Sequence, residues 1–499
     1  MSTRFAPLLA PFLALVCVAL AHGQAWEPRS ERWYVLTLGE MPCGFSHESV
    51  YHRTVADGSV ELRTTGEIEM RFRRLGEVTQ ISMQSEFTES ARGEPIEASC
   101  SQGESSRVRW RFDAEHKRVT RQQGSNAPEP SAWPAESFLT PRAVEKYIAA
   151  RLAAGATEIA FTAIDLQSGC VAAHTTMTLA KDERRARVFE VKSSLVPIVA
   201  REQYAADGVL LESAMPLGIG ALVSKLAKEG DARAALASGN FDLLRGTLIP
   251  SAPIPNAARL ARATFRVTTT APLIVLPSCA SQVVRLDPST PQVAIVEVDC
   301  DSASAVSAGE QEVGRWLKSN TFLDAEHKAV VALLDQAKPV AGQRPLARAE
   351  QLRKLVAKHL KSKNFKTAFG TASEAAISRS GDCTEHAVLL AALCRADGLP
   401  SRVVSGVVFV DAAGGEGCSW GWHMWTQALV SNGRSGNGDD ALMWVDLDAT
   451  LPTRFHAAHI AVAASDLSAG SGDPVFLGAL ALIGQVKIEF VPESATHGR

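Results

Sequence analysis

Apolar and polar residues alternate along most of the first 300 residues, which is the pattern of β-strands with one buried face. The segment VELRTTGEIEMRFRRLGEVTQISMQSEF (60–87) alternates in this way, with glycines between its apolar runs. RRARVFEVKSSLVPIVAREQYAADGVLLESAM (184–215) repeats the pattern, and its Asp207–Gly208 pair predicts a hairpin turn. The stretches 263–277 and 283–300 are further candidate strands. We therefore predict a β-rich region over residues 24–305.

Two helical segments and a linker divide this region. TPRAVEKYIAARLAAG (140–155) has Thr140 as a helix cap and Pro141 at the first helical position. GALVSKLAKEGDARAALASG (220–239) is predicted as a second helix. The Pro- and Ser-rich stretch 124–137 is predicted as a linker between two β-rich halves of similar texture.

The pattern changes from about residue 306. Apolar residues recur at helical spacing in the segments 310–320, 325–338, 346–362 and 371–381, and again in the stretch that begins GDCTEHAVLLAALCRADGLP (381–400). Alternation then returns in SRVVSGVVFV, HMWTQALV and ALMWVDLDAT. Helices packed on an antiparallel sheet define an α+β fold class. We predict one domain over residues 306–499, with a C-terminal strand extension.

The N-terminus has the composition of a secretory signal. Arg4 precedes an apolar run from Ala6 to Leu20, and Ala21 and Gly23 are small residues suited to cleavage before Gln24. Residues 1–23 are therefore predicted to be a signal peptide, and the remainder to be exported to a periplasmic or extracellular space. No other segment is predicted to span a membrane. The apolar stretch 473–491 shifts to alternation at VKIEFV, which favours a buried helix or turn that leads into a strand.

Composition narrows the functional classes. The 499 residues are 46% hydrophobic and 21% charged, with a formal net charge of −3, which gives no reason to expect a nucleic-acid partner. The basic run KLVAKHLKSKNFK (354–366) is interpreted as a solvated helix face. Eight cysteines follow the signal, with no CxxC and no zinc-module spacing, and an odd number remains if one thiol stays free for chemistry.

Cys383 stands in the first turn of a predicted helix, where Asp382 is the cap and Gly398 ends the helix. Free backbone N–H groups and the helix dipole favour an anion there, so a thiol at this position is favoured as the nucleophilic thiolate. The same groups suit an oxyanion formed when the sulfur attacks a carbonyl. Cys394 lies roughly 16 Å further along the helix, too far to bridge with Cys383, and is interpreted as a core residue.

A thiolate nucleophile needs a base, and the base needs a group that orients it. His423 heads an alternating strand, and Asp446 and Asp448 lie on one face of the next. If the intervening loop closes symmetrically, Val430 faces Ala441 and His423 faces Asp448, although Asp446 shares that face. Taken singly, a helix-start cysteine or a strand histidine is more often structural, but their order and separation favour a Cys-His-Asp triad.

The segments GDCTEHAVLLAALCRADGLPSRVVSG, HMWTQA and WVDLDAT resemble the transglutaminase-like superfamily, which has a papain-type fold. The resemblance covers roughly residues 310–460 and implies Cys383 as the nucleophile, His423 as the base and Asp448 as the orienting carboxylate. Ala449 stands where the family usually has proline. The β-rich region resembles the amino-terminal halves of bacterial exported proteins that carry this domain.

Four further residues are candidates for the substrate cleft. His386 follows Cys383 by one turn and is interpreted as packing beneath the site or bonding to the backbone, because a base on the nucleophile's own helix is poorly placed to reach the leaving group. Trp420, Trp422 and Trp425 are candidates to wall the cleft, with core packing as the alternative for each.

The resemblance implies an exported thiol enzyme that performs acyl transfer or hydrolysis on amides of a protein or peptide substrate. The chemistry requires no metal or other cofactor, and the sequence has no EF-hand loop. The alternative hypothesis is a catalytically silent binding or assembly module. The sequence leaves open the substrate, the choice between water and amine as acceptor, and the oligomeric state.

Overall fold

The computed structural model describes residues 25–74, 77–103, 107–124, 127–183, 186–196, 198–242, 246–270, 276–286, 289–301, 310–362, 370–411, 417–431, 442–468 and 482–492. The predicted signal peptide, the loop 432–441 and the apolar stretch 473–481 lie outside these residues. Among the described helices, none has the length and apolar character needed to cross a membrane.

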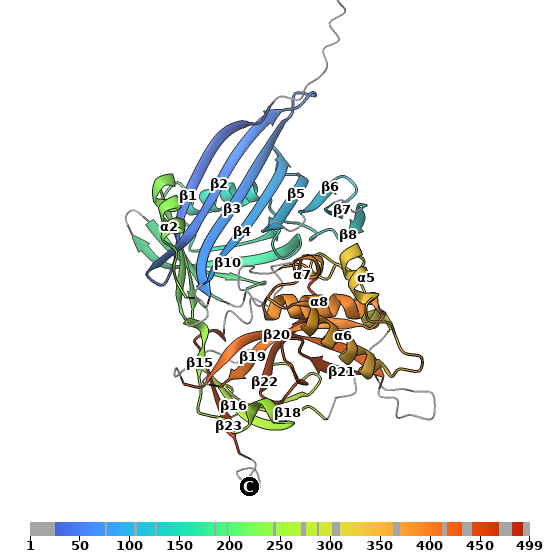
Figure 1. Cartoon of the computed structure of the whole chain (residues 1–499). Coiled ribbons are helices and arrows are strands. Elements are labelled where there is room, and N and C mark those ends of the chain that lie inside the picture. The colour runs from blue at the N-terminus through green and yellow to red at the C-terminus, as the bar shows by residue number, and fades with distance from the viewer. Residues whose placement is uncertain are drawn as a thin grey trace, which may run out of the picture.

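One antiparallel sheet of 14 strands contains both β-rich halves (Figure 1). Its order is β8-β7-β6-β5-β4-β3-β2-β1-β14-β13-β12-β11-β10-β9, so the first strand and the last strand of the region pair at its centre. The strands are β1 (Glu27–Leu38), β2 (Met41–Thr54), β3 (Val60–Arg74), β4 (Glu77–Ser90), β5 (Pro95–Gln102), β6 (Val108–Asp113), β7 (Arg118–Gln123), β8 (Glu129–Ser131), β9 (Glu158–Asp165), β10 (Val171–Glu183), β11 (Ala186–Ser193), β12 (Ala200–Tyr204), β13 (Leu210–Leu217) and β14 (Gly220–Ala227).

Two helices cover parts of this sheet. Helix α1 (Pro141–Ala153) begins at Thr140 with proline at its start, as predicted, and buries Ile148 and Leu152 against residues of β9–β12, including Phe189. Helix α2 (Glu229–Ser238) packs Ala232 against Trp33 and Phe45. These residues, 27–238, are called the N-terminal unit below.

The predicted helix over 220–239 is only half correct. Residues Gly220–Ala227 form strand β14, and only Glu229–Ser238 are helical. The sequence GALVSKLA fits either structure locally, but β14 pairs with β13 on one side and with β1 on the other, and this pairing outweighs helix propensity. The Asp207–Gly208 turn is confirmed, because Gly208 adopts a φ of +87° between β12 and β13.

A second group of strands forms two smaller sheets. One has the order β15-β20-β19-β22, with β21 also paired to β20, and the other has the order β17-β18-β16-β23. The strands are β15 (Ile249–Pro250), β16 (Arg262–Thr269), β17 (Gln282–Leu286), β18 (Val293–Asp299), β19 (Ser401–Val410), β20 (Ser419–Ser431), β21 (Leu442–Leu447), β22 (His459–Ser465) and β23 (Val486–Val491). Strand β19 matches the predicted strand residue for residue.

The two small sheets share one core, in which Phe265, Trp420 and Ile460 are buried together. Strands β16–β18 therefore lie with the later part of the chain, whereas the sequence grouped them with the β-rich region that ends at residue 305. We propose a division near residue 240, and residues 249–491 are called the C-terminal unit below. A hydrogen bond from Arg121 to Thr321 (3.1 Å) joins the two units.

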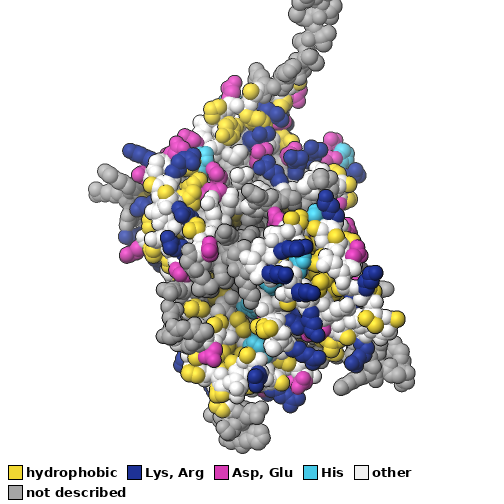
Figure 2. Space-filling view, viewed as in Figure 1, with side chains coloured by type: hydrophobic (Ala, Val, Ile, Leu, Met, Phe, Trp, Pro, Cys, Tyr) yellow, Lys and Arg dark blue, Asp and Glu magenta, His cyan; other side chains and the backbone are white. Residues whose placement is uncertain are grey.

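Helices α6 and α8 of the C-terminal unit pack on the sheet that contains β20, as the α+β prediction requires, and α5 and α7 pack against α8 (Figure 1). They are α4 (Glu310–Arg315), α5 (Lys328–Leu334), α6 (Pro345–His359), α7 (Ala372–Ser378) and α8 (Cys383–Ala396). Helix α8 is buried from Thr384 to Arg395 and is the centre of the largest apolar core. Helix α6 exposes Lys354 and Lys358, and Figure 2 shows Lys and Arg side chains gathered over the helical face of this unit.

Candidate active site

Helix α8 begins as the sequence predicts. The Asp382 side chain accepts a hydrogen bond from the Thr384 N–H (2.8 Å), and the Glu385 side chain accepts one from the Asp382 N–H (2.8 Å). This capping box satisfies backbone donors that a helix start otherwise leaves unpaired. Cys383 is therefore held as the first residue of a buried helix, partly accessible, and is a free thiol.

Glu385 also fixes the chain that leads into the helix. Its second carboxylate oxygen accepts a hydrogen bond from the Gly370 N–H (3.0 Å), and burial, together with the neighbouring Asp382, raises the pKa of Glu385 to about 7. Gly381 has a φ of +154°, and a Cβ atom there would lie 2.4 Å from the Glu385 Cβ. Only glycine allows this close approach, which explains the Gly-Asp-Cys-x-Glu sequence locally.

The register between β20 and β21 differs from the symmetric-loop prediction by two residues. Val430 pairs with Met443 rather than with Ala441, and Gln427 pairs with Asp446. A shift of two residues leaves every side chain on its predicted face, so the two aspartates still lie on the His423 side. Asp448 follows the last residue of β21 and meets His423 from beyond the paired strand.

The two candidate aspartates have different partners. Asp446 accepts hydrogen bonds from the side chains of Trp425 (2.8 Å), Gln427 (2.7 Å) and Ser281 (2.6 Å). Its contacts tie β20 to the chain that precedes β17. Asp446 is therefore a structural link between strands, and the prediction that favoured Asp448 as the partner of His423 agrees with the hydrogen bonds.

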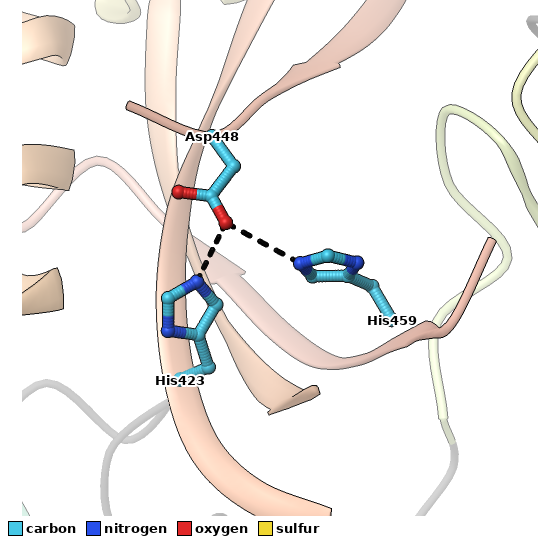
Figure 3. Close-up of side chains that lie close together, drawn as sticks. All are labelled: His423, Asp448 and His459. Carbon is cyan, nitrogen blue, oxygen red and sulfur yellow. Dashed lines mark hydrogen bonds and ion pairs between the residues drawn. The ribbon is translucent and has the colours of Figure 1, made fainter. Parts of the chain in front are cut away.

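Asp448 is fully buried and its four acceptor positions are all in use. Its Oδ1 atom accepts hydrogen bonds from the Thr450 N–H (2.8 Å) and the Thr450 hydroxyl (2.6 Å). Its Oδ2 atom lies 2.8 Å from His423 Nε2 and 3.3 Å from His459 Nε2 (Figure 3). Burial opposes ionisation, but the charge and hydrogen bonds of His423 and His459 hold the pKa of Asp448 well below its usual range.

His423 is positioned between this carboxylate and the thiol. Its Nε2 atom is taken by Asp448, which leaves Nδ1 as the other polar atom of the ring, and the Cys383 side chain is near enough to contribute to the raised pKa of the ring. Burial alone lowers the pKa of His423, but the Asp448 carboxylate, its hydrogen bond and the Cys383 side chain outweigh burial and raise the pKa to about 10. The structure thus pairs the imidazole with the carboxylate, and Cys383 as their nucleophilic partner stays a prediction.

The sequence reasoning missed His459. It heads strand β22, is buried, and reaches the same Asp448 oxygen as His423 from a different strand (Figure 3). Its Nδ1 atom lies 2.9 Å from the backbone carbonyl of His456. The available signal was the segment FHAAHIAVAAS, in which a histidine directly precedes an alternating apolar strand, as His423 does in its own segment.

The remaining predicted residues lie at different depths. His386 is buried and its Nδ1 atom bonds to the Asp382 carbonyl (2.7 Å), as the backbone-bonding interpretation expected. Trp420 has no exposed surface and packs against Phe265 and Phe409, so it cannot line a cleft that is open to solvent. Trp425 is also buried and packs near the His423 ring, and Trp422 is partly exposed.

The ligand atoms of His423, Asp448 and His459 lie within 4.8 Å of one another, so this group was tested as a metal site. Two ligands about 2.1 Å from a tetrahedral zinc ion are separated by about 3.4 Å. The 2.8 Å between His423 Nε2 and Asp448 Oδ2 is shorter than that and is a hydrogen-bond distance. The spacing therefore fits a shared proton better than a shared metal ion.

One protein family matches the part of the chain that contains this site. Residues 335–449 match the family described as the transglutaminase-like superfamily, and this segment includes Cys383, His423 and Asp448. The chain therefore contains a transglutaminase-like domain, as its sequence motifs predicted. No curated protein matches the chain.

Three solved structures show weak similarity. A putative cysteine protease from Cytophaga hutchinsonii is 12% identical, with a TM-score of 0.27, and the match covers 47% of this chain and 83% of that one. A β-barrel-like protein of a domain of unknown function from Brucella abortus is 11% identical, with a TM-score of 0.28 and coverage of 40% and 95%. The periplasmic domain of TgpA from Pseudomonas aeruginosa is 17% identical, with a TM-score of 0.25 and coverage of 39% and 91%. These TM-scores are too low to define a common fold, and no property of those proteins is carried over from them.

Proposed function

We propose that this protein is a thiol enzyme that transfers acyl groups from amides of a protein or peptide, with Cys383 as nucleophile, His423 as base and Asp448 as the residue that positions the base. The observation that carries the proposal is the arrangement around His423. One ring nitrogen bonds to a buried carboxylate at 2.8 Å, and the thiol of Cys383, at a helix start, is among the neighbours that raise the pKa of the ring.

The reaction follows from these positions. The Cys383 sulfur attacks the amide carbonyl carbon as His423 holds the thiol proton, and the N-terminus of α8 stabilises the negative charge on oxygen. His423 then gives the proton to the departing amine or ammonia, and the C–N bond breaks to leave a thioester. Water or a second amine attacks the thioester, His423 accepts the proton of the attacking group, and the Cys383 thiolate leaves.

Export is part of the proposal, because residues 1–23 have the sequence of a secretory signal. The substrate would then be a protein or peptide of a periplasmic or extracellular space. The alternative is a binding or assembly module without turnover. The filled hydrogen-bonding shell of Asp448 and the raised pKa of His423 favour the enzyme, because a silent module has no need for a buried imidazole held between a thiol and a carboxylate.

The test is incubation with glutamine-containing proteins and a labelled primary amine, scored for amine incorporation, ammonia release and peptide cleavage. We expect Cys383→Ala to abolish all three, a loss of at least about 10³-fold. The matched control is Cys418→Ala, which removes another partly exposed thiol, one that bonds to Asp411. Turnover by the Cys383→Ala protein equal to that of the natural chain would contradict the proposal.

A further inference from the structure

His459 is a buried titratable residue to which the proposed chemistry gives no task. Its side chain has no exposed surface, yet it touches the same Asp448 oxygen as His423. The neighbouring charged or titratable groups are Asp448, His423, His456 and Arg353. Arg353 donates to the backbone carbonyls of Asp448 (3.3 Å) and Leu451 (3.0 Å) and is paired with Glu350.

Both ring nitrogens of His459 face groups that only accept hydrogen bonds. Nδ1 lies 2.9 Å from the His456 carbonyl oxygen, and Nε2 lies 3.3 Å from Asp448 Oδ2. A neutral imidazole carries one proton, so one of these two contacts would set a nitrogen lone pair against an oxygen lone pair in a buried place. A ring with both protons satisfies both contacts.

We propose that His459 is a buried imidazolium that holds the Asp448 carboxylate in place, and is a positioning residue for the Cys383–His423 pair. It rests on the proposed function only for its effect on catalysis, because the protonation of the ring does not depend on turnover. Asp448 then has a fixed cationic partner whichever way the catalytic proton lies.

The charge balance of the site supports this assignment. When the proton moves between the Cys383 sulfur and His423, the total charge of that pair stays zero. With Asp448 ionised, a neutral His459 would leave one net negative charge buried, whereas an imidazolium brings the whole group to zero in both states. Buried charges are retained in proteins when they are paired in this way.

The rings around His459 also favour a cation there. Phe455 and Trp425 lie with ring centroids 4.4 Å and 5.4 Å from it, within the range at which aromatic rings attract cations. The adjacent His456 does not compete for the proton, because burial and the neighbouring His459 lower the pKa of His456 to about 4.

The direct test is NMR of the full-length protein with ¹⁵N-labelled histidine side chains, with the His459 signals assigned by their loss in His459→Gln. At pH 7 we expect both His459 nitrogens to carry protons, in the natural chain and in Cys383→Ala alike. A His459 nitrogen without a proton at pH 7 would overturn the proposal. A metal ion that co-purifies with the protein and keeps both His459 nitrogens unprotonated would overturn it as well.

A second measurement separates positioning from folding. His459→Gln keeps a donor near Asp448 but removes the charge, so His423 should hold its proton more tightly, by about two pH units for charges about 6 Å apart at an effective dielectric constant of about 20. The His423 ring of the variant should therefore lose its proton at a higher pH than that of the natural chain. His459→Leu removes donor and charge, and we expect exchange of the His423 Nε2 proton to be at least about tenfold faster than in His459→Gln.

The control is His116→Gln, which alters an exposed histidine paired with Asp113 in the N-terminal unit. It should leave the His423 signals unchanged. An unchanged His423 titration in His459→Gln would overturn the inference, because a neutral His459 predicts that result. These signals do not need substrate, so an inactive natural chain with a protonated His459 would defeat the proposed function and leave this inference standing.

Discussion

One group of charged side chains in each unit illustrates two different arrangements. In the N-terminal unit, Arg32 lies 2.8 Å from Glu145 and 3.5 Å from Glu48, so opposite charges pair and fix α1 to the large sheet. In the C-terminal unit, two imidazoles share the one carboxylate of Asp448, and a thiol shares one of the imidazoles. The first arrangement joins one cation to two carboxylates, whereas the second joins one carboxylate to two imidazoles.

This difference indicates where function and where stability reside. A pair of opposite charges has little to gain from a change of protonation, and its removal should cost stability alone. A chain of a thiol, an imidazole and a carboxylate changes protonation during chemistry, and its removal should cost activity first. The experiments below test this separation, from the largest expected effect to the smallest.

The sharpest comparison is between the two aspartates of one strand segment. We expect Asp448→Asn to reduce acyl transfer roughly 10³–10⁴-fold, because an amide cannot stabilise a charged His423 and does not hold the required tautomer. Asp446→Asn should cost no more than about tenfold, since Asp446 bonds to Trp425, Gln427 and Ser281 rather than to His423. Measured kcat values for both variants decide this, and equal losses would contradict the assignment of Asp448.

A cavity in the N-terminal unit should affect stability without affecting chemistry. Phe189 is fully buried beneath α1, so Phe189→Ala should lower the free energy of unfolding of this unit by about 3–5 kcal/mol, while kcat per folded molecule stays within about twofold. Urea unfolding and activity titration measure the two effects. Leu389→Ala in α8 is the matched variant, and it should disturb both because α8 carries Cys383. A large loss of kcat in Phe189→Ala would mean that the N-terminal unit takes part in the active site.

Cys383 should react about a hundredfold faster than the buried thiols of either unit. Burial raises the pKa of Cys43 to about 11 and of Cys170 and Cys394 to about 12, so these thiols are seldom ionised at neutral pH. Cys383 lies beside a protonated His423 at a helix start, and we expect iodoacetamide to modify it first at pH 7, as followed by peptide mass spectrometry. Labelling in urea, where all thiols are equally accessible, is the control. Slow and undifferentiated labelling of the folded protein would favour the silent module.

The smallest effect is a pH dependence that differs between the units. Burial, with the neighbouring Glu145, raises the pKa of Glu48 from 4.5 to about 7, so the folded chain binds this proton more tightly than the unfolded chain does. The stability that this group contributes is therefore lost as pH rises from about 4.5 through 7. Asp448 raises the pKa of His423 to about 10, so its contribution is complete below about pH 6.5 and is lost as pH rises through 10.

Unfolding free energies from pH 4.5 to pH 10 test both windows. Glu48→Gln should remove the lower window and His423→Gln the upper one, each relative to the natural chain. If Glu48→Gln instead removed the pH dependence near pH 10, or His423→Gln that between pH 4.5 and 7, the assignment of these groups would be wrong.

Local sequence signals predicted the elements of the site well. The start of α8 could be predicted from Gly381, Asp382 and Glu385, because helix capping depends on residues that are close in sequence. The alternation of apolar and polar residues predicted β19 and the face that His423 shares with Asp448. Each side chain lies on its predicted face of the sheet although the register differs by two residues, because side chains in a strand point to the same face at every second residue.

Long-range pairing could not be predicted from the sequence. Nothing in GALVSKLA indicates that this segment pairs with β1, almost 190 residues earlier, so the local pattern alone predicts a helix. His459 was missed for a similar reason. A lone histidine before an apolar strand has many ordinary roles, and its importance follows only from the fold that brings it to Asp448.

The pairing of β1 with β14 has a consequence for how the protein is made. On the ribosome, Trp33 emerges long before its partner Ala227, and strand β16 must wait for β23, close to the end of the chain. Both closures bring together segments that are far apart along the polypeptide, which is the slowest kind of step in folding. The fold would therefore stay unfinished, with open strand edges, until synthesis is nearly complete.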